Sequence, residues 1–150
     1  MEALPPQFDT PDLRQRIALI ADSHQRLTGR PLVAAGGDLV AALWNAPLAV
    51  VAHGTEADPL FFFGNRAALT AFKADLSRFI GMPSRLSAEA PDRAERQALL
   101  DRVTAHGYVD DYAGSRVKLD GEHFRIENAT VWNLIDKAGV RRGQAAAFAV

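Results

Sequence analysis

The sequence predicts a single α+β domain in which helices pack on a five-stranded antiparallel sheet. Three observations lead to this fold class. Hydrophobic residues recur at helical spacing near the N-terminus, short apolar runs of strand length follow them, and two turn motifs near the C-terminus join extended segments into a meander. With 48% hydrophobic and 23% charged residues, a chain of 150 residues can bury one ordinary core.

The N-terminal part predicts two helices that precede the sheet. A flexible N-terminus is expected over residues 1–9. A helix then begins at Thr10, where a capping side chain is followed by proline, and ends at Gly29. A shorter helix is expected over residues 38–44, and the two together form a helical leader over residues 10–46. The apolar stripe of the longer helix consists of Leu13, Ile17, Ile20 and Leu27.

The core of the domain is expected in residues 47–150. Asp120-Gly121 is the strongest hairpin motif, and Asp92 followed by Glu95 predicts a capped helix start. The helices of this part are expected on one face of the sheet. The expected order is two buried strands (48–52 and 60–63), short helices (65–81), a turn (83–87), a longer helix (92–106) and three strands (108–119, 122–136 and 143–150).

This order of elements resembles the PAS fold, and four blocks of sequence give a closer match. Residues 64–69, 83–89, 124–134 and 143–146 together resemble the MEKHLA domain family, which is PAS-like. Members of that family occur as stand-alone bacterial proteins and at the C-terminus of plant homeodomain leucine-zipper regulators. The resemblance spans residues 10–150. It implies a PAS-like fold with a sensory or regulatory role, and it implies no known ligand, reaction or catalytic residue.

The sequence also predicts the kinds of partner. It lacks the DNA-binding and zipper segments of the plant members, so any effect on DNA is expected to pass through a separate signalling protein. Direct binding of nucleic acid is not expected, because 17 basic and 18 acidic residues are spread without a dense basic patch. No signal peptide or membrane-spanning apolar run is visible, which predicts a cytoplasmic protein without membrane contact.

Six residues are candidates for contacting a small-molecule ligand, and three of them come from one predicted strand. Alternation places Asn128, Thr130 and Trp132 on the same sheet face, where two polar groups would lie in an apolar wall. A buried polar group requires a partner in the protein or in a ligand. A structural hydrogen bond or a β-bulge near Asn128 is the favoured alternative. The apolar members of this face are Phe124, Ile126 and Leu134.

The other three candidates are Asn65, Arg85 and Gln144. Arg85 lies where PAS folds line their pocket with short helices, and a guanidinium recognises carboxylate or phosphate. Capping of a helix end, or pairing with Glu89, is the alternative role for Arg85. Gln144 lies on the last strand, which borders the cavity in PAS domains, and its amide can donate to or accept from a bound ring. Asn65 precedes a short helix, which it can also cap.

The cofactor remains unknown from the sequence. Absence of cysteine excludes disulfides, thiolate metal sites and cysteine-dependent flavin photochemistry. Haem is not favoured, because its one candidate axial ligand, His106, is expected at a helix C-terminus, where histidine commonly caps. No metal site is expected either, since the spacing of His53, Glu56 and Asp58 matches no established ligand set.

The favoured function is a sensory module that binds an unidentified small molecule and signals to a separate partner. The first alternative is a homodimeric interaction module without ligand, in which Leu13, Ile17 and Ile20 pack on the outer sheet face of another copy. An enzyme, with His53 and Asp58 or Asp110 and Asp111 as an acid–base pair, is the least favoured because no motif supports it.

Overall fold

The computed structural model describes residues 1–34, 36–89 and 92–150. Its helices are η1 (Pro6–Phe8), α1 (Pro11–Thr28), α2 (Leu39–Asn45), α3 (Arg66–Phe72), α4 (Leu76–Phe79), η2 (Ser84–Ser87) and α5 (Arg93–His106). Its strands are β1 (Ala49–His53), β2 (Phe61–Gly64), β3 (Tyr108–Val117), β4 (His123–Ile135) and β5 (Arg141–Phe148). The predicted order of elements is confirmed, with strand boundaries shifted by one or two residues.

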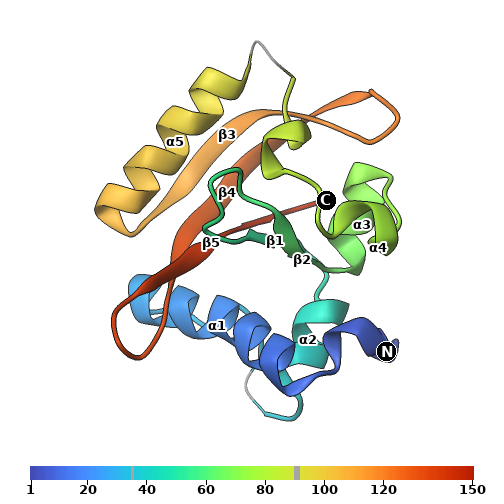
Figure 1. The fold of residues 1–150 in the computed structure, drawn as a ribbon, viewed down its shortest axis with the longest axis vertical. Helices are drawn as coiled ribbons and strands as arrows, with labels where there is room; N and C mark the ends of the chain where they lie inside the picture. The colour runs from blue at the N-terminus through green and yellow to red at the C-terminus, as the bar shows by residue number, and fades with distance from the viewer. Residues whose placement is uncertain (35, 90–91) are drawn as a thin grey trace.

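The five strands form one antiparallel sheet in the order β2-β1-β5-β4-β3, which confirms the predicted fold class. β1 and β5 are far apart in the sequence but adjacent in the sheet, where Val51 pairs with Ala146. Figure 1 shows α1 and α2 on one side of the sheet and α3, α4 and α5 on the other. Both faces are therefore covered, and the place of the N-terminal helices is a feature that the sequence did not predict.

Helix α1 is fixed to the sheet by packing and by hydrogen bonds. Ile17 and Ile20 are fully buried in the core cluster between α1 and the sheet. The indole Nε1 of Trp132 donates to the backbone oxygen of Ile20 at 3.0 Å, and the hydroxyl of Ser23 accepts from the backbone nitrogen of Ile135 at 2.9 Å. The stripe predicted to pack on a second copy is thus buried within its own chain, because it covers an otherwise bare sheet face.

The N-terminus is also part of this core. Phe8 is buried, and its ring centroid lies 6.0 Å from that of Trp44 and 5.2 Å from that of Phe63. Residues 1–9 were expected to be flexible, but one aromatic side chain within them anchors the segment, since burial of an aromatic ring is strongly favourable.

Asn65 holds together the junction of α2, β1 and α3. Its Oδ1 accepts hydrogen bonds from the backbone nitrogens of Val50 and Ala68, both at 3.0 Å. Its Nδ2 donates to the backbone oxygens of Leu43 at 3.0 Å and Leu48 at 2.9 Å. The side chain is fully buried. All of its hydrogen-bonding capacity is therefore satisfied by the protein.

Replacing Asn65 with alanine is expected to lower the free energy of unfolding by about 1–3 kcal/mol, because buried backbone groups lose their partners. Urea unfolding monitored by tryptophan fluorescence measures this change. Asn45 is a matched control, since two of its three side-chain hydrogen bonds to the backbone are solvent-exposed. Asn45→Ala is expected to cost less than about 1 kcal/mol. Equal losses in the two variants would contradict the structural role of Asn65.

The capping box predicted at the start of α5 is not formed. The side chain of Asp92 makes no cap hydrogen bond, and its backbone is already helical, with φ −92° and ψ −6°. A capping residue is normally extended, which lets its side chain reach the free amides of the first turn. None of the described helices combines the length and the apolar character that crossing a bilayer requires.

Candidate functional site

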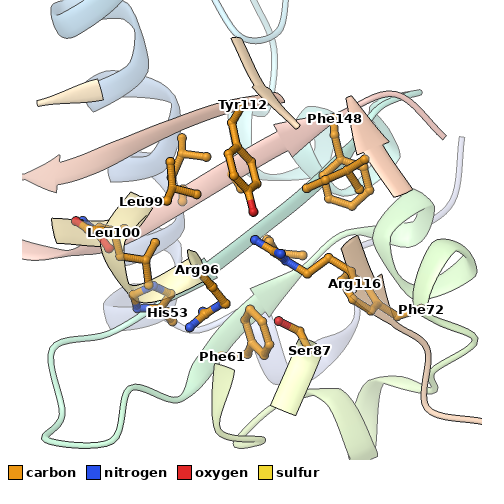
Figure 2. A pocket seen from close by; sticks show the side chains of 16 residues that line it. His53, Phe61, Phe72, Ser87, Arg96, Leu99, Leu100, Tyr112, Arg116 and Phe148 are labelled. Carbon is orange, nitrogen blue, oxygen red and sulfur yellow. The ribbon is translucent and has the colours of Figure 1, made fainter. Parts of the chain in front are cut away.

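A small cavity of about 50 Å³ lies between α5 and the sheet face opposite α1. Its walls come from β1, β2, α3, η2, α5, β3, β4 and β5, which are distant in the sequence. Figure 2 shows the side chains that line it. The apolar lining consists of Val51, Phe61, Phe72, Leu99, Leu100, Ile126, Val131, Ala145, Ala146 and Phe148. The remaining lining side chains are His53, Ser87, Arg96, Tyr112, Arg116 and Gln144. The cavity thus combines an apolar interior with a few hydrogen-bonding groups, as small-molecule sites do.

Helix α5 turns one face toward the cavity. Arg96, Leu99 and Leu100 are spaced three and four residues apart, which places their side chains on the same side of a helix. Val103 extends this face and is fully buried against the sheet. Arg96 therefore occupies a position in the apolar stripe of α5, and it is 7% exposed.

Strand β3 contributes two more polar side chains to the cavity. Tyr112, Gly114 and Arg116 alternate along β3 and are all buried on the same face. A Cβ atom at Gly114 would lie 2.1 Å from the hydroxyl of Tyr112, so glycine leaves the space in which the phenol lies. The guanidinium of Arg116 lies 5.3 Å from the centre of the Tyr112 ring, a cation–π geometry.

The cavity is positively charged. Burial, and secondarily the charge on Arg116, lower the pKa of Arg96 to about 10, so the Arg96 guanidinium remains protonated at neutral pH. Arg116 is 8% exposed and donates from Nη1 to the backbone oxygen of Ser115 at 2.8 Å. None of the ion pairs in the described part of the chain includes either arginine.

His53 at the end of β1 is a buried neutral side chain. Burial, with a smaller contribution from the positive charges of Arg96 and Arg141, lowers its pKa to about 4. Its Nδ1 lies 3.0 Å from the backbone oxygen of Gly54, which fixes the proton on Nδ1. Its Nε2 is buried and has no hydrogen-bond partner among the described residues. A free acceptor therefore lies in the wall of the cavity.

Gln144 and Asn133 tie the end of α5 to the sheet beside the cavity. Gln144 Nε2 donates to Asn133 Oδ1 and Thr104 Oγ1, both at 3.0 Å, and to the backbone oxygen of Leu100 at 3.1 Å. Asn133 Nδ2 donates to the backbone oxygen of Val103 at 2.9 Å. A change in the position of Gln144 would therefore alter its hydrogen bonds to both α5 and β4.

The structure brings only one of the six predicted ligand contacts, Gln144, to this cavity. Asn65 caps α3 and is occupied by backbone groups. Arg85 lies on the surface, where its Nε is 3.2 Å from both carboxylate oxygens of Asp58. The alternative partner considered for Arg85, Glu89, instead lies 3.2 Å from the imidazole of His123. An exposed guanidinium pairs with whichever carboxylate lies nearest in the folded protein. Spacing in the sequence does not show which carboxylate that is.

A β-bulge at Asn128 separates the remaining three candidates from the cavity. Asn128 has φ 51° and is exposed. Two residues lie between Ile126 and Ala129 on β4, whereas only one lies between their partners on β3. The extra residue reverses the alternation, so Ile126 and Ala129 face the same cluster. Thr130 and Trp132 consequently face α1. The predicted single apolar wall was wrong, and the bulge considered as its alternative is present.

The left-handed conformation of Asn128 gives a direct test of this bulge. Asn128→Val is expected to lower the free energy of unfolding by about 1–3 kcal/mol, because a β-branched residue is strained at positive φ. Asn128→Gly keeps this conformation accessible and is expected to be nearly neutral. Chemical unfolding of both variants measures the difference. An equally stable valine variant would show that the register does not require the bulge.

The other sequence candidates for metal or haem lie outside the cavity, apart from His53. His106 is exposed at the last position of α5. Among the described residues, no three or more carboxylates and histidines are grouped as they would be around a metal ion. The sequence pattern indicates His53 only for metal or acid–base chemistry, and Arg96, Arg116 and Tyr112 are not among the candidates that it predicts. The sequence feature that could have indicated Arg96 is its position as a charged residue in the apolar stripe of α5.

Residues 14–150 match the sequence model of the MEKHLA domain. This chain belongs to the MEKHLA domain family. Among curated proteins, this MEKHLA domain is similar to the homeobox-leucine zipper protein ATHB-9 of Arabidopsis thaliana, with 28% identity over 138 residues. The match covers 85% of the chain and only 16% of that much longer plant protein.

Solved structures show that the MEKHLA domain has a PAS-like fold. The PAS domain of a protein from Colwellia psychrerythraea superposes with a TM-score of 0.64 at 15% identity, covering 72% of this chain and 89% of that one. The photo-excited blue-light photoreceptor Vivid gives 0.63 at 13% identity, covering 94% and 98%. An ethanol complex of the PAS domain of a LuxR-family regulator from Burkholderia thailandensis gives 0.59 at 20% identity, covering 74% and 96%.

Proposed function

We propose that this MEKHLA domain is a sensory module that binds a small molecule in the cavity between α5 and the sheet. The main observation behind this proposal is Nε2 of His53, a buried nitrogen of a cavity-lining side chain that has no hydrogen-bond partner among the described residues. Buried polar groups in native proteins nearly always have a hydrogen-bond partner, so an unpartnered one in a cavity wall calls for a bound species. The PAS-like fold, shared with sensory PAS and photoreceptor domains, supports this role.

The size of the cavity limits the ligand. A volume of about 50 Å³ is far below the roughly 300–1,000 Å³ of sites for drug-sized molecules. The ligand is therefore a molecule of a few heavy atoms. A PAS domain of similar fold holds ethanol, a ligand of this size class.

Strand β4 provides a route from the cavity to the opposite face of the sheet. Val131 lines the cavity, and its neighbour Trp132 donates to the backbone oxygen of Ile20 in α1. We propose that ligand binding changes how firmly α1 is held, and that a separate protein recognises this change. Such a response requires that the ligand has different affinities for the two arrangements. Slower hydrogen exchange at α1 in the ligand-bound domain would support this step, and unchanged exchange there would contradict it.

Native mass spectrometry of the gently purified chain tests the binding proposal. The expected result is the chain plus one small mass at a ratio of one to one. Ala146 lines the cavity, and Ala146→Val adds two methyl groups to a strand position where a β-branched residue fits. This variant is expected to lose the bound mass while remaining folded. A bare chain, together with no stabilisation by any small molecule in a thermal-shift panel, would contradict a ligand site.

An enzymatic role has weaker support from the same residues. Perturbed titratable groups in a cavity can indicate catalysis. However, His53 with a pKa of about 4 is a weak base at neutral pH, and no carboxylate from the described part of the chain lines the cavity. The hydroxyl of Ser87 donates to the backbone oxygen of Ser84 at 2.7 Å, so it is not paired with a base. Binding therefore explains the geometry better than acid–base or nucleophilic chemistry.

A further inference from the structure

We propose that the ligand of this cavity is a small carboxylate whose oxygens are held by the guanidinium groups of Arg96 and Arg116. This inference rests on the proposed function, because it names the chemical class of the molecule that the cavity binds.

The first observation is a local excess of positive charge. Two arginines line the cavity, and no aspartate or glutamate does. The residues outside the described part of the chain are Ala35, Ala90 and Pro91, which carry no charge on their side chains. The cavity therefore has a charge of about +2 at neutral pH, with His53 neutral. A buried charge without a counter-ion is costly, so an anion in this space would relieve a cost that the fold otherwise bears.

Exposed arginines of this domain have carboxylate partners, whereas the two arginines of the cavity do not. Arg14, Arg85 and Arg142 each have an aspartate oxygen within 3.2 Å, although water could solvate them. The two buried arginines, which need a counter-ion most, have none among the described residues. The ring of Tyr112 interacts favourably with Arg116, but a cation–π contact does not neutralise the charge.

The shape and the lining favour a carboxylate over phosphate. A guanidinium is a planar fork of donors that matches the two oxygens of a carboxylate. The rest of the lining is largely apolar and includes Leu99, Ile126 and Val131, which suit a short hydrocarbon tail and leave the further oxygens of phosphate unsatisfied. A volume of about 50 Å³ limits the acid to roughly two or three carbons without rearrangement of the walls.

His53 favours a ligand that carries a hydrogen-bond donor in addition to its carboxylate. Its Nδ1 is engaged by the backbone oxygen of Gly54, so its unpartnered Nε2 can only accept a hydrogen bond. A hydroxyl on the ligand would supply the missing donor, whereas an ammonium group would be repelled by the two arginines. A 2-hydroxy acid is therefore expected to bind more tightly than the same acid without its hydroxyl.

Titrations of the full chain with three matched probes test the anion requirement. The probes are propionate, its uncharged analogue propionamide, and inorganic phosphate, each added to ¹⁵N-labelled protein at neutral pH in buffer free of other carboxylates. We expect propionate to bind at least tenfold more tightly than propionamide, as for hydrogen bonds to a charged group, and more tightly than phosphate. Equal binding of propionate and propionamide would overturn the anion requirement, and tighter binding of phosphate would overturn the assignment to a carboxylate.

Variants of the two arginines locate the binding site. Arg96→Met and Arg116→Met are each expected to raise the Kd for propionate at least about tenfold, since one charge-assisted contact is lost. Arg96→Lys keeps the charge without the planar fork and is expected to fall between wild type and Arg96→Met. Arg85→Met is the control, because Arg85 is exposed and paired with Asp58. Should one methionine variant not fold, the other still decides the question, and an unchanged Kd would overturn the site.

The outcomes separate this inference from the proposed function. Ala146→Val should bind none of the probes, because it fills the cavity. If wild type binds propionamide as tightly as propionate and Ala146→Val binds neither, the cavity is a ligand site and the carboxylate is wrong. If wild type binds no probe and no other small molecule, both proposals fail.

The hydroxyl requirement is tested by comparing lactate with propionate, which differ by one hydroxyl group. Lactate is expected to bind about 2- to 12-fold more tightly to wild type, the range for one neutral hydrogen bond. His53→Phe should abolish this difference while leaving propionate binding in place. Equal affinities for the two acids in wild type would overturn the role assigned to His53.

Discussion

Replacing Arg96 with methionine is expected to raise the free energy of unfolding by about 1–4 kcal/mol in buffer without small carboxylates, by analogy with buried charges replaced by apolar residues of similar volume. Arg96 is 7% exposed, lies in the apolar stripe of α5, and has no counter-ion among the described residues. Methionine preserves the unbranched stem and removes the desolvated charge. The gain in stability would reflect a residue kept for binding rather than for folding.

Urea unfolding at neutral pH measures this effect, with Arg85→Met as the matched control. Arg85 is half-exposed and paired with Asp58, so the control is expected to change stability by less than about 1 kcal/mol, and in the destabilising direction. Addition of propionate should then stabilise wild type more than it stabilises Arg96→Met, because the variant binds the acid more weakly. A methionine variant less stable than wild type would mean that Arg96 supports the fold, which would contradict the account.

Acid is expected to destabilise the domain through His53. Its pKa is about 4 in the folded state and about 6.5 when unfolded. Above pH 6.5 the side chain is neutral in both states and contributes no pH dependence. Between about pH 6.5 and 4 the unfolded state gains a proton and the folded state does not, so the free energy of unfolding falls as pH falls. The loss amounts to about 3 kcal/mol across this window and stops below about pH 4.

A comparison of wild type with His53→Gln isolates this contribution from that of other groups. Burial also lowers the pKa of His24, and carboxylates titrate in acid, but both variants contain these groups. The difference in stability between the two proteins is expected to shift by about 2–3 kcal/mol between pH 7.5 and 4.5, in favour of the glutamine variant at the lower pH. Parallel stability curves over this range would show that His53 is not buried as a neutral side chain.

Local features of the fold were predictable from the sequence. The Thr10 side chain accepts from the backbone nitrogen of Leu13 at 3.3 Å, and Gly29 ends α1 with φ 75°, as the capping pattern indicated. The Asp120-Gly121 turn joins β3 and β4 as expected. These features depend on residues that are close in the sequence, so short-range stereochemistry decides them.

The register of β4 was not predictable, because one residue changed it. Alternation assigns a face correctly only while the pairing is regular, and the left-handed Asn128 adds one residue to β4. Trp132 was therefore expected in the cavity and instead faces α1. The arrangement of α1 on the second face could not be inferred either, since a helix stripe shows that a face is buried without showing which surface buries it.

The candidate site was missed for a related reason. His53, Arg96 and Arg116 come from β1, α5 and β3, and only the fold brings them to one cavity. Three of the six predicted contacts came from β4, whereas the charged residues of the cavity lie among apolar neighbours on α5 and β3. Arg96 precedes Leu99 by one helical turn, and Arg116 alternates with Tyr112, so both patterns were visible as breaks in an apolar face.

Locating a bound acid shows whether the cavity holds a small carboxylate beside its two arginines. Intermolecular nuclear Overhauser effects between ¹³C-labelled propionate and the protein report which side chains the acid contacts. We expect contacts from the propionate methyl group to the methyl groups of Leu99 and Val131, and we expect them to disappear in Ala146→Val. Contacts confined to surface residues outside the cavity would contradict it.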